Sequence, residues 1–480
     1  MEVKISKSDV VWSYLAQFFN IASGFITLPL ILTMLTTEEI AMNYLMLTVG
    51  TLVALIDFGF NPQFGRNVTY VFSGAQNLTK NGLDGVQTGQ INYHLLKGLI
   101  AVAKTTYKLM SLIVLVIMLT FGTWYIYSVT DGFTNVSNSF LIWLVYSVST
   151  FFNIYFYYYS SLLTGSGQIK ESKQALLASR VGYIVLAYIM LLMGWGLMGV
   201  VLANLISPFL GRALSHYFFY TRELSNNLAR EIITKEEKKE LFDVIWYNAK
   251  KLGVNFIGAY AITKFAMFIA GLYLSMDDIA SYGLMSQIVS ILTGVANVFF
   301  STFIPSINNY KVMGENENLI RNFARSQLVF ILVYIIGAIV IVTLGPWILD
   351  IIKSNAELPA SYIMILFLLI TLLENNHANF ATVITAGNKV PFVAAALISG
   401  GLICVFDFLV LQFTALGMLG IIIVPGIVQL SYNNWYWPRY VLKEYNVSIF
   451  KFIRLGVKEL ITQIMGFINT LSSRISRCKQ

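Results

Sequence analysis

The sequence predicts an all-α, polytopic membrane protein with about 12 transmembrane helices in two six-helix lobes around a central cavity. Three observations carry this prediction. Of the 480 residues, 57% are hydrophobic and 12% are charged, whereas a soluble domain carries roughly 25% charged residues. Apolar stretches recur along the whole chain, most of them reaching the roughly 20 residues that a spanning helix needs. Two segments of the first half also recur in the second half.

The apolar stretches define the predicted spans in chain order. They lie at 10–35, 40–62, 109–129, 139–164, 174–193, 196–219, 252–274, 279–304, 324–345, 359–386, 390–412 and 416–437. The first stretch follows Lys4 and Lys7, but no small-residue cleavage site separates it from the second. We therefore expect an uncleaved helix and no signal peptide. Because the number of spans is even, both termini lie on one side of the membrane.

The positive charges predict which side that is. Of the 32 Lys and Arg residues, 30 fall on the side of the termini, either in the connecting segments or near the adjoining span ends, whereas Lys353 falls on the other side and Lys264 falls deep within a span. Cytoplasmic loops carry such an excess of Lys and Arg, so we expect both termini in the cytoplasm. The basic residues are spread over many short segments, so the net charge of +8 gives no support to nucleic-acid binding.

Two internal matches predict the lobes. Residues 35–41 match 274–280, and Gly196–Val200 match Gly417–Ile421. Because each half has an even number of spans, the repeats are parallel, and a substrate site is expected between them. The predicted domains are a first lobe at 1–219, a cytoplasmic connector at 220–250, a second lobe at 251–437 and a basic amphipathic cytoplasmic tail at 438–480. The alternative for the tail is one or two further short spans.

The end of the second span carries a family resemblance. Residues 57–66 read DFGFNPQFGR, and this motif resembles the one that closes the second span in the oligosaccharide (O-antigen, Wzx-type) flippases of the polysaccharide transport family. That family belongs to the multidrug/oligosaccharidyl-lipid/polysaccharide (MOP) exporter superfamily. The two predicted lobes, the short outer loops and the twin Gly-x-x-Gly pattern of spans 6 and 12 are also similar. Some polysaccharide transporters have fourteen spans, from which this chain departs unless the tail adds two.

The resemblance implies a function and a location. It implies a flippase in the bacterial cytoplasmic (inner) membrane that moves polyprenyl-diphosphate-linked oligosaccharide to the outer leaflet by alternating access, for surface polysaccharide biosynthesis. The implied partners are the lipid-linked oligosaccharide, membrane lipids, a coupling ion (proton or sodium) and polysaccharide assembly machinery. No cofactor is implied.

Charged residues inside spans are the first candidates for the substrate site. A charge in hydrocarbon costs roughly 2.5 to 3.5 kcal/mol on insertion and therefore indicates a function. Lys264 and Glu374 each lie about 12 residues, or roughly 18 Å, from the cytoplasmic end of their spans, so we expect them at a common depth. One interpretation is a structural ion pair. The other makes Lys264 a cavity cation that binds the diphosphate, with Glu374 holding it.

The tenth span is unusually polar around Glu374. Asn375, Asn376, His377 and Asn379 follow it, and Glu374 and His377 share one helix face. We count Asn375 and His377 as substrate-site candidates. His377 is either a satisfied structural residue or, with Glu374, a carrier of a coupling proton. A metal site is not expected, because no further His or Cys stands at ligand spacing.

The motif of the second span supplies the remaining candidates, Asp57, Asn61 and Arg66. Pro62 interrupts the helical hydrogen bonds, so we expect an unwound region that aims Arg66 into the cavity mouth. The alternative for Arg66 is an ordinary cytoplasmic anchor. Asp57 lies deeper in the membrane and is expected to pair with Arg66. Asp407, nearer the outer surface, is expected to snorkel to water.

Two other classes of function compete. A membrane polysaccharide polymerase is an enzyme that needs catalytic groups in a sizeable outer loop, and the outer connections here are short. A drug/cation antiporter of the same superfamily would favour acidic cavity groups over Arg66 and Lys264. No G-x-x-x-x-G-K-[ST] motif is present, which excludes ATP-driven transport by this chain.

Overall fold

The computed structural model describes residues 26–80, 82–84, 90–386 and 391–477, together with positions 12, 15, 19 and 24. It confirms the all-α, polytopic membrane fold. Within this described part, nine helices are long and apolar enough to cross a membrane. They are Thr37–Asp57, Tyr93–Val129, Ser139–Gly165, Ile169–Leu192, Gly196–Phe219, Met276–Lys311, Asn316–Ile352, Ser361–Thr385 and Val393–Phe413. These match predicted spans 2–6 and 8–11, and the first predicted span lies partly outside the described residues.

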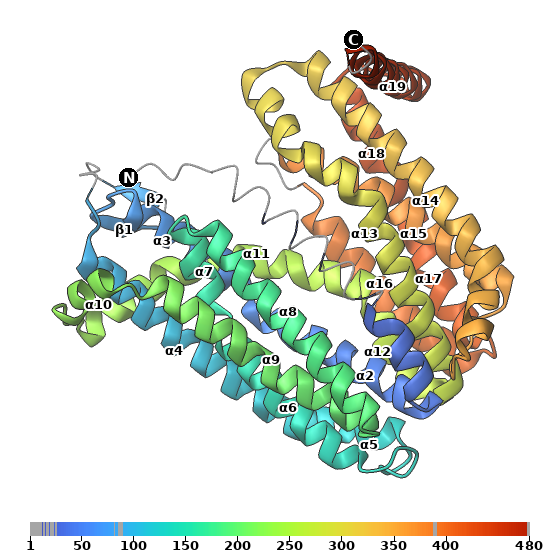
Figure 1. Ribbon diagram of the computed structural model, residues 1–480, viewed down its shortest axis with the longest axis horizontal. Coiled ribbons are helices and arrows are strands. Elements are labelled where there is room, and N and C mark those ends of the chain that lie inside the picture. The colour runs from blue at the N-terminus through green and yellow to red at the C-terminus, as the bar shows by residue number, and fades with distance from the viewer. Residues whose placement is uncertain are drawn as a thin grey trace. The chain divides into compact units, whose positions relative to one another are not determined.

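The chain divides into two compact units, and the first comprises Met1–Gly283 with Ile352–Ala356. Within it, α8 and α9 pack side by side, and α6 packs on both α9 and α4 (Figure 1). Its elements are α2 (Thr37–Ala54), η1 (Leu55–Asp57), α3 (Phe60–Phe72), β1 (Asn77–Thr79), β2 (Gly82–Asp84), α4 (Tyr93–Ile117), a π-helical turn η2 (Met118–Gly122), α5 (Thr123–Val129), α6 (Ser139–Tyr155), α7 (Tyr158–Gly165), α8 (Ile169–Leu192), α9 (Gly196–Phe219), α10 (Arg222–Ala229), α11 (Lys235–Thr263), α12 (Phe265–Tyr273) and the start of α13 (Met276–Met313).

The second unit comprises Leu284–Ile351 and Glu357–Gln480. Its helices are the rest of α13, α14 (Asn316–Ile352), α15 (Ser361–Thr385), α16 (Val393–Phe413), α17 (Gly417–Ser431), α18 (Asn433–Glu444) and α19 (Ile449–Arg477). The division by contacts does not coincide with the predicted lobe boundary at residue 250, which stays a prediction. In the tail, α19 is one helix whose Phe452 packs on Phe323 and Phe380.

The two sequence matches coincide with equivalent local structure. Thr36 caps α2 through the N–H of Glu39, and Ser275 accepts a hydrogen bond from the N–H of Asp278 in the first turn of α13. A hydroxyl at the start of a helix satisfies an N–H that has no partner within the helix. In the second match, Gly196 and Gly417 begin α9 and α17 with φ of 52° and 50°, a backbone conformation that glycine adopts at low cost.

Two predicted spans are interrupted. Span 7 divides into α11 and α12 at Lys264, and span 12 divides into α17 and α18 at Tyr432. Polar side chains at the second break offer the chain other hydrogen bonds: Asn433 donates to Gln429 and Ser399 at 2.7 and 2.9 Å. Such local bonds compete with a continuous helix, and hydropathy does not detect them.

The third span begins earlier than predicted. Helix α4 starts at Tyr93, where the side chain of Asn92 accepts the N–H of Leu95 at 3.0 Å, whereas hydropathy placed the start at 109. Lysines on the first turns of α4 lower the hydropathy without interrupting the helix. The short hairpin of β1 and β2 precedes it and was not predicted.

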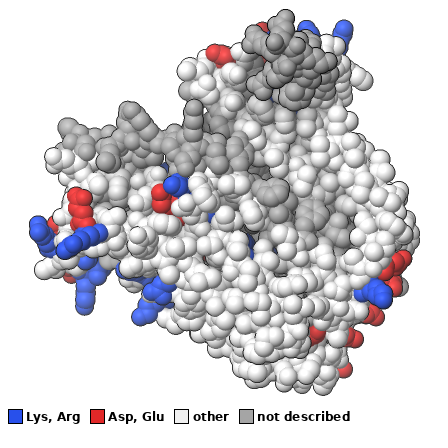
Figure 2. All heavy atoms as spheres, viewed as in Figure 1, with Lys and Arg blue, Asp and Glu red and all other residues white. Residues whose placement is uncertain are grey.

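The surface of the helices agrees with a membrane setting. Large apolar side chains are exposed on α4, α14 and α16, including Val116, Ile336 and Ile398 at 61%, 62% and 64%. In Figure 2 most of the visible surface carries neither Lys or Arg nor Asp or Glu. Exposed apolar surface of this extent is typical of helices that face lipid. The chain is thus a multi-pass membrane protein.

Candidate functional site

Lys264 lies at a break between two helices. It ends α11 and begins α12, with φ of −128° and ψ of −22°, and its N–H still bonds to the carbonyl of Tyr260 at 2.9 Å. Its side chain is exposed, while residues 266–271 of α12 are buried. A charged lysine inside a span needs water or polar partners around its ammonium group, because hydrocarbon does not solvate a charge.

The break also gives α12 an N-terminus of its own. The first N–H groups of a helix lack partners within it, and the helix dipole places positive charge at that end. Lys264 therefore adds its ammonium charge to the positive end of α12. Helices broken within the membrane present such ends to anionic groups of substrates in other transporters. Both features favour a negative over a positive charge at this position.

The motif at residues 57–66 contains a helix break, but the break lies before Pro62 and not at it. Phe58 and Gly59 adopt left-handed conformations, with φ of 45° and 79°, and α3 begins at Phe60. Pro62 lies in the first turn of α3, where a missing N–H costs nothing. The prediction that Pro62 unwinds the helix is therefore wrong, and the break precedes it.

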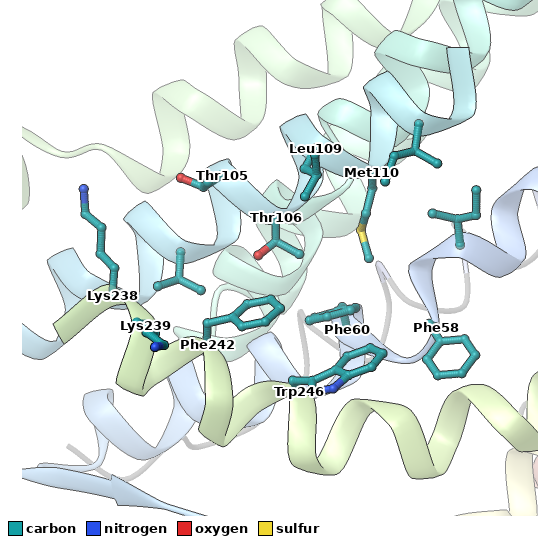
Figure 3. A pocket seen from close by; sticks show the side chains of 13 residues that line it. Phe58, Phe60, Thr105, Thr106, Leu109, Met110, Lys238, Lys239, Phe242 and Trp246 are labelled. Carbon is teal, nitrogen blue, oxygen red and sulfur yellow. The ribbon is translucent and has the colours of Figure 1, made fainter. Parts of the chain in front are cut away.

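Side chains of α11 hold the break in place. The ring of Trp246 stacks on Phe58 and Phe60, with centroids 5.7 and 5.6 Å away, and Phe242 stacks on Phe60 at 6.0 Å (Figure 3). Aromatic pairs at these separations contribute about 0.5 to 1.5 kcal/mol each beyond their burial. The motif and α11 are thus one packed assembly, which the sequence did not indicate.

Asp57 and Asn61 meet at this break. Oδ1 of Asp57 accepts the hydroxyl of Tyr107 at 2.5 Å, and Oδ2 accepts the N–H of Asn61 at 3.3 Å. The side chain of Asn61 donates to the carbonyl of Tyr157 at 3.3 Å. Asp57 is therefore held by Tyr107 and by the first turn of α3, and its carboxylate partners are these two groups in place of the expected Arg66.

Arg66 lies on an exposed face of α3. The neighbouring positions Phe64 and Val68 are fully buried in the core of the first unit, so α3 presents Arg66 on the opposite side. This placement agrees with either expected role, the cytoplasmic anchor or the cation at a cavity mouth.

The tenth span carries a connected polar network. The side chain of Asn379 donates to Gln327 and Asn297 at 3.0 and 3.2 Å, and Gln327 donates to Asn376 at 2.8 Å. Asn297 donates to Asn375 at 3.5 Å. The partners come from α13 and α14, and buried polar groups in a membrane protein need such partners. The sequence located the α15 members but not Asn297, which stands alone within an apolar stretch, or Gln327, which directly follows Arg325 and Ser326.

His377 and Glu374 lie beside this network on α15. Nδ1 of His377 is 2.8 Å from Oδ1 of Asn434 and 3.7 Å from Oε2 of Glu374. Because the amide oxygen only accepts, Nδ1 carries the proton in this arrangement. Asn434 lies in the first turn of α18, so this contact joins α15 to the start of α18, directly after the break at Tyr432.

Asp407 differs from its expected position. It is fully buried, and neither carboxylate oxygen has a hydrogen-bond partner within the described part of the chain. It therefore does not snorkel to water. A buried carboxylate without donors is costly when ionised.

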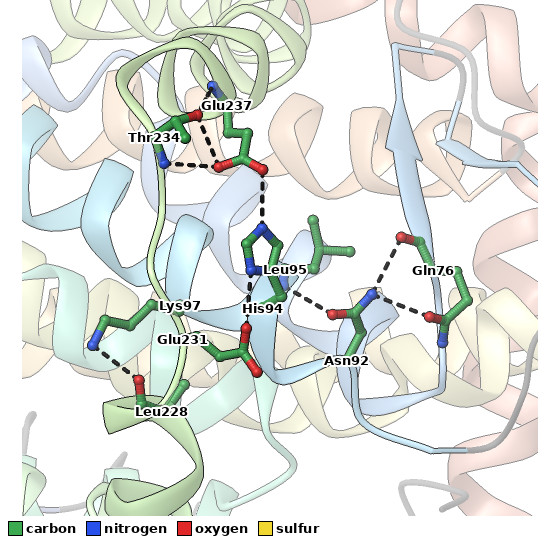
Figure 4. Close-up of polar contacts among 9 residues, drawn as sticks. All are labelled: Gln76, Asn92, His94, Leu95, Lys97, Leu228, Glu231, Thr234 and Glu237. Atoms are coloured by element: carbon green, nitrogen blue, oxygen red, sulfur yellow. Dashed lines mark hydrogen bonds and ion pairs between the residues drawn. The ribbon is translucent and has the colours of Figure 1, made fainter.

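A further polar cluster joins α4 to the segment before α11. The two ring nitrogens of His94 lie 3.0 Å from carboxylates of Glu231 and Glu237, and Glu237 also caps α11 through Thr234 (Figure 4). Nζ of Lys97 donates to the carbonyl of Leu228 at 3.0 Å. Among the residues that the structure covers, no group of three His, Cys, Asp or Glu side chains could hold a metal ion.

The candidates fall into both units. Lys264, Asp57, Asn61 and Arg66 belong to the first, whereas Glu374, Asn375 and His377 belong to the second. Asp57 and Asn61 come together, as do Glu374 and His377. The pairing of Lys264 with Glu374 and their common depth stay predictions.

The fold has known counterparts. The chain resembles an inward-facing multidrug resistance MATE family transporter of the MOP superfamily, with a TM-score of 0.62 and 14% identity over 90% of this chain and 95% of that one. It also resembles the lipid II flippase MurJ in an inward closed conformation, with a TM-score of 0.60 and 12% identity over 97% of this chain and 93% of that one. No family model matches the sequence, and no curated protein does. At these identities the likeness shows the fold.

Proposed function

We propose that this chain is a flippase for polyprenyl-diphosphate-linked oligosaccharide, which it moves to the outer leaflet by alternating access for surface polysaccharide biosynthesis. The observation that carries the proposal is the position of Lys264, an exposed residue at the break between α11 and α12. A diphosphate is the part of such a substrate that this arrangement recognises, because the lysine and the end of α12 both favour anions. Asp57, Asn61 and Arg66 supply further polar contacts at the start of α3.

The fold supports a transporter over an enzyme. Both structural counterparts are transporters, and one of them is named as a flippase of a lipid-linked substrate. The membrane polysaccharide polymerase therefore has less support than either transporter class. The resemblance of residues 57–66 to the oligosaccharide flippases supports the oligosaccharide as the cargo.

The second candidate is a drug/cation antiporter, and the likeness to the MATE family transporter favours it. A cation-binding cavity is lined by acidic or aromatic groups, because these attract positive charge. The exposed cation of Lys264 opposes that electrostatic requirement. We therefore place the flippase first.

We assign proton coupling to Glu374 and His377. They share one face of α15 with a separation of 3.7 Å between Oε2 and Nδ1, and carboxylate and imidazole groups in membranes are typical proton carriers. Asn375, which lies next to them, joins the same network through Asn297.

The test is transport of lipid-linked oligosaccharide in liposomes that contain the purified protein. Lys264→Ala removes the charge and should abolish transport, and Lys264→Arg should retain part of it. Lys250→Ala is the matched control, because Lys250 lies on the same helix and its ammonium group stacks on the ring of Tyr247 at 5.5 Å. Full activity of Lys264→Ala, with Lys250→Ala also active, would remove Lys264 from the site. Export of a cationic dye by the wild type, without transport of oligosaccharide, would favour the antiporter.

A further inference from the structure

A groove of about 680 Å³ opens between α4 and α11 in the first unit. The α4 side is formed by Val102, Leu109 and Met110, and the α11 side by Phe242 and Trp246 (Figure 3). The volume is in the range that holds a small-molecule ligand or a hydrocarbon chain. Ile56, Phe58 and Phe60, from the segment that carries Asp57 and Asn61, complete its lining, whereas Lys264 lies at the other end of α11 and does not line it.

The walls of the groove are apolar and open to the surroundings. Leu109, Ile113 and Trp246 are 59%, 44% and 38% exposed. The hydroxyl of Thr105 bonds back to the carbonyl of Ala101 at 2.9 Å and so offers little to a ligand. Apolar surface of this kind at a membrane boundary is covered by hydrocarbon.

One end of the groove carries positive charge. Lys238 and Lys239 line it there, and their spacing of three to four residues from Phe242 places all three on one face of α11. Neither lysine forms a salt bridge within the described residues. Two acidic residues adjoin the lysines in the sequence: Glu237 is turned to Thr234 and His94, and Glu240 is not among the residues that line the groove. The groove is therefore amphipathic, with two lysines at one end.

The direction of the groove agrees with the orientation of a lipid. Lys238 and Lys239 precede the predicted seventh span, in the segment that the Lys and Arg distribution places in the cytoplasm, whereas Leu109 and Ile113 lie in the predicted third span. Basic residues next to spans on the cytoplasmic side bind anionic head groups, and a Trp such as Trp246 is typical of that boundary.

We propose that this groove binds one anionic glycerophospholipid of the cytoplasmic leaflet, with its phosphate at Lys238 and Lys239 and one acyl chain between α4 and α11. The bilayer supplies such lipids in excess. The diphosphate of the transported substrate is assigned above to Lys264, whereas the lipid phosphate is assigned to Lys238 and Lys239 at the opposite end of α11. The inference goes beyond the proposed function and does not depend on it, because lipid binding is measured without transport.

The experiment is native mass spectrometry of the full-length protein in detergent. Phosphatidylglycerol and phosphatidylcholine with identical acyl chains are added in turn, and the occupancy of the tightest bound lipid is compared. We expect phosphatidylglycerol to bind roughly tenfold more tightly or better, because each basic residue near a head group contributes at this scale. Lys238→Glu/Lys239→Glu should remove this preference, and Thr105→Trp, which fills the groove, should remove binding of both lipids.

The matched control is Arg222→Glu/Arg230→Glu, which makes the same change of charge on exposed residues of the connector outside the groove. It should retain the preference for phosphatidylglycerol. The milder Lys238→Gln/Lys239→Gln pair, with size-exclusion profiles of all variants, separates loss of charge from misfolding.

Several results would overturn the inference. Equal binding of the two lipids to the wild type would do so, as would an unchanged preference after reversal of the two lysines, or an equal loss in the arginine control. Polyprenyl phosphate is also added in competition. If it displaces phosphatidylglycerol at equal or lower concentration, the groove is a site for the carrier lipid and our assignment is wrong.

Discussion

The hydroxyl of Tyr107 donates a 2.5 Å hydrogen bond to Oδ1 of Asp57 and so ties the middle of α4 to the end of η1. Tyr107 is fully buried in the core of the first unit. The other oxygen of Asp57 accepts the N–H of Asn61, which is one of the N–H groups that α3 itself leaves unpaired. A single carboxylate thus holds both the preceding turn and the following helix across Phe58 and Gly59.

Tyr107→Phe should therefore destabilise the protein. The change leaves Asp57 with one donor in place of two, and removing one partner from a charged acceptor costs about 1 to 3 kcal/mol. We expect a lower unfolding temperature in a thermal unfolding assay in detergent. Tyr127→Phe is the control, because Tyr127 is 54% exposed. Equal unfolding temperatures for the two variants would show that the Asp57 bond adds no stability.

Gly253→Ala should also destabilise the protein, through the contact between α11 and the same break. A Cβ at Gly253 would overlap with ring atoms of Phe58 close to its own Cβ, so the ring could not swing clear without moving the backbone. Overpacking of this kind costs about 1 to 3 kcal/mol.

Gly401→Ala is the control for Gly253→Ala. It lies inside α16 with no atom within 4 Å of its added Cβ, and alanine is favoured over glycine in a helix by about 0.5 to 1 kcal/mol. The two variants should thus change the unfolding temperature in opposite directions. A rise for both would mean that Phe58 yields at no cost.

Hydropathy and charge counts were sufficient for the fold class and for most of the spans, because a spanning helix must be apolar over its length. The two internal matches also proved informative, since the matched Gly196 and Gly417 both have a positive φ where their helices begin. Lys264 and the polar segment of α15 were found as candidates because a charge or a run of amides within hydrocarbon is expensive.

The sequence did not reveal what those candidates contact. The partners of the α15 network, Asn297 and Gln327, are single polar residues on other helices, and one-dimensional patterns carry no information on which helices pack together. The helix break at Phe58 was missed because proline is the stronger local signal, yet Pro62 falls in a first turn that tolerates it. The break at Lys264 has no glycine or proline beside it, so no local sequence signal predicts it.

The cluster around His94 should respond to pH. A neutral imidazole has one N–H, so simultaneous donation to Glu231 and Glu237 requires the protonated ring. The backbone N–H of Thr234, followed by the ring of His94 and the Thr234 hydroxyl, lowers the pKa of Glu237 from 4.5 to about 2. Ionised Glu237 therefore stabilises the fold at every pH above 4.5, the usual pKa of the group. This contribution is lost only as the pH falls toward 2. The hydrogen bonds to Glu237 and Glu231 raise the pKa of His94, so the imidazole keeps its proton to a higher pH than usual and loses it as the pH rises further.

Raising the pH from about 6 to about 9 should therefore loosen the segment between α10 and α11. The measurement is hydrogen exchange of amides 228–237, corrected for the intrinsic effect of pH. Protection should fall with rising pH in the wild type, and His94→Gln, which cannot gain a charge, should show no such change. Equal pH profiles for wild type and His94→Gln would contradict the charged clamp.

Glu374→Gln should separate coupling from transport. Glu374 lies 3.7 Å from Nδ1 of His377, which in turn is 2.8 Å from Asn434, so a proton gained or lost at Glu374 changes the charge beside a hydrogen bond that links α15 to α18. Glutamine keeps the size of the side chain and fixes its charge at zero. In liposomes, an imposed pH gradient should speed transport by the wild type at least roughly fivefold. This factor is at the lower end of the coupling usually found between two sites of one protein. Glu374→Gln should transport at one rate in both conditions.

Glu357→Gln changes an exposed carboxylate outside the spans and should behave like the wild type. If Glu374→Gln keeps the response to the gradient, the coupling proton travels through other groups, and Glu374 only completes the polar interior of α15.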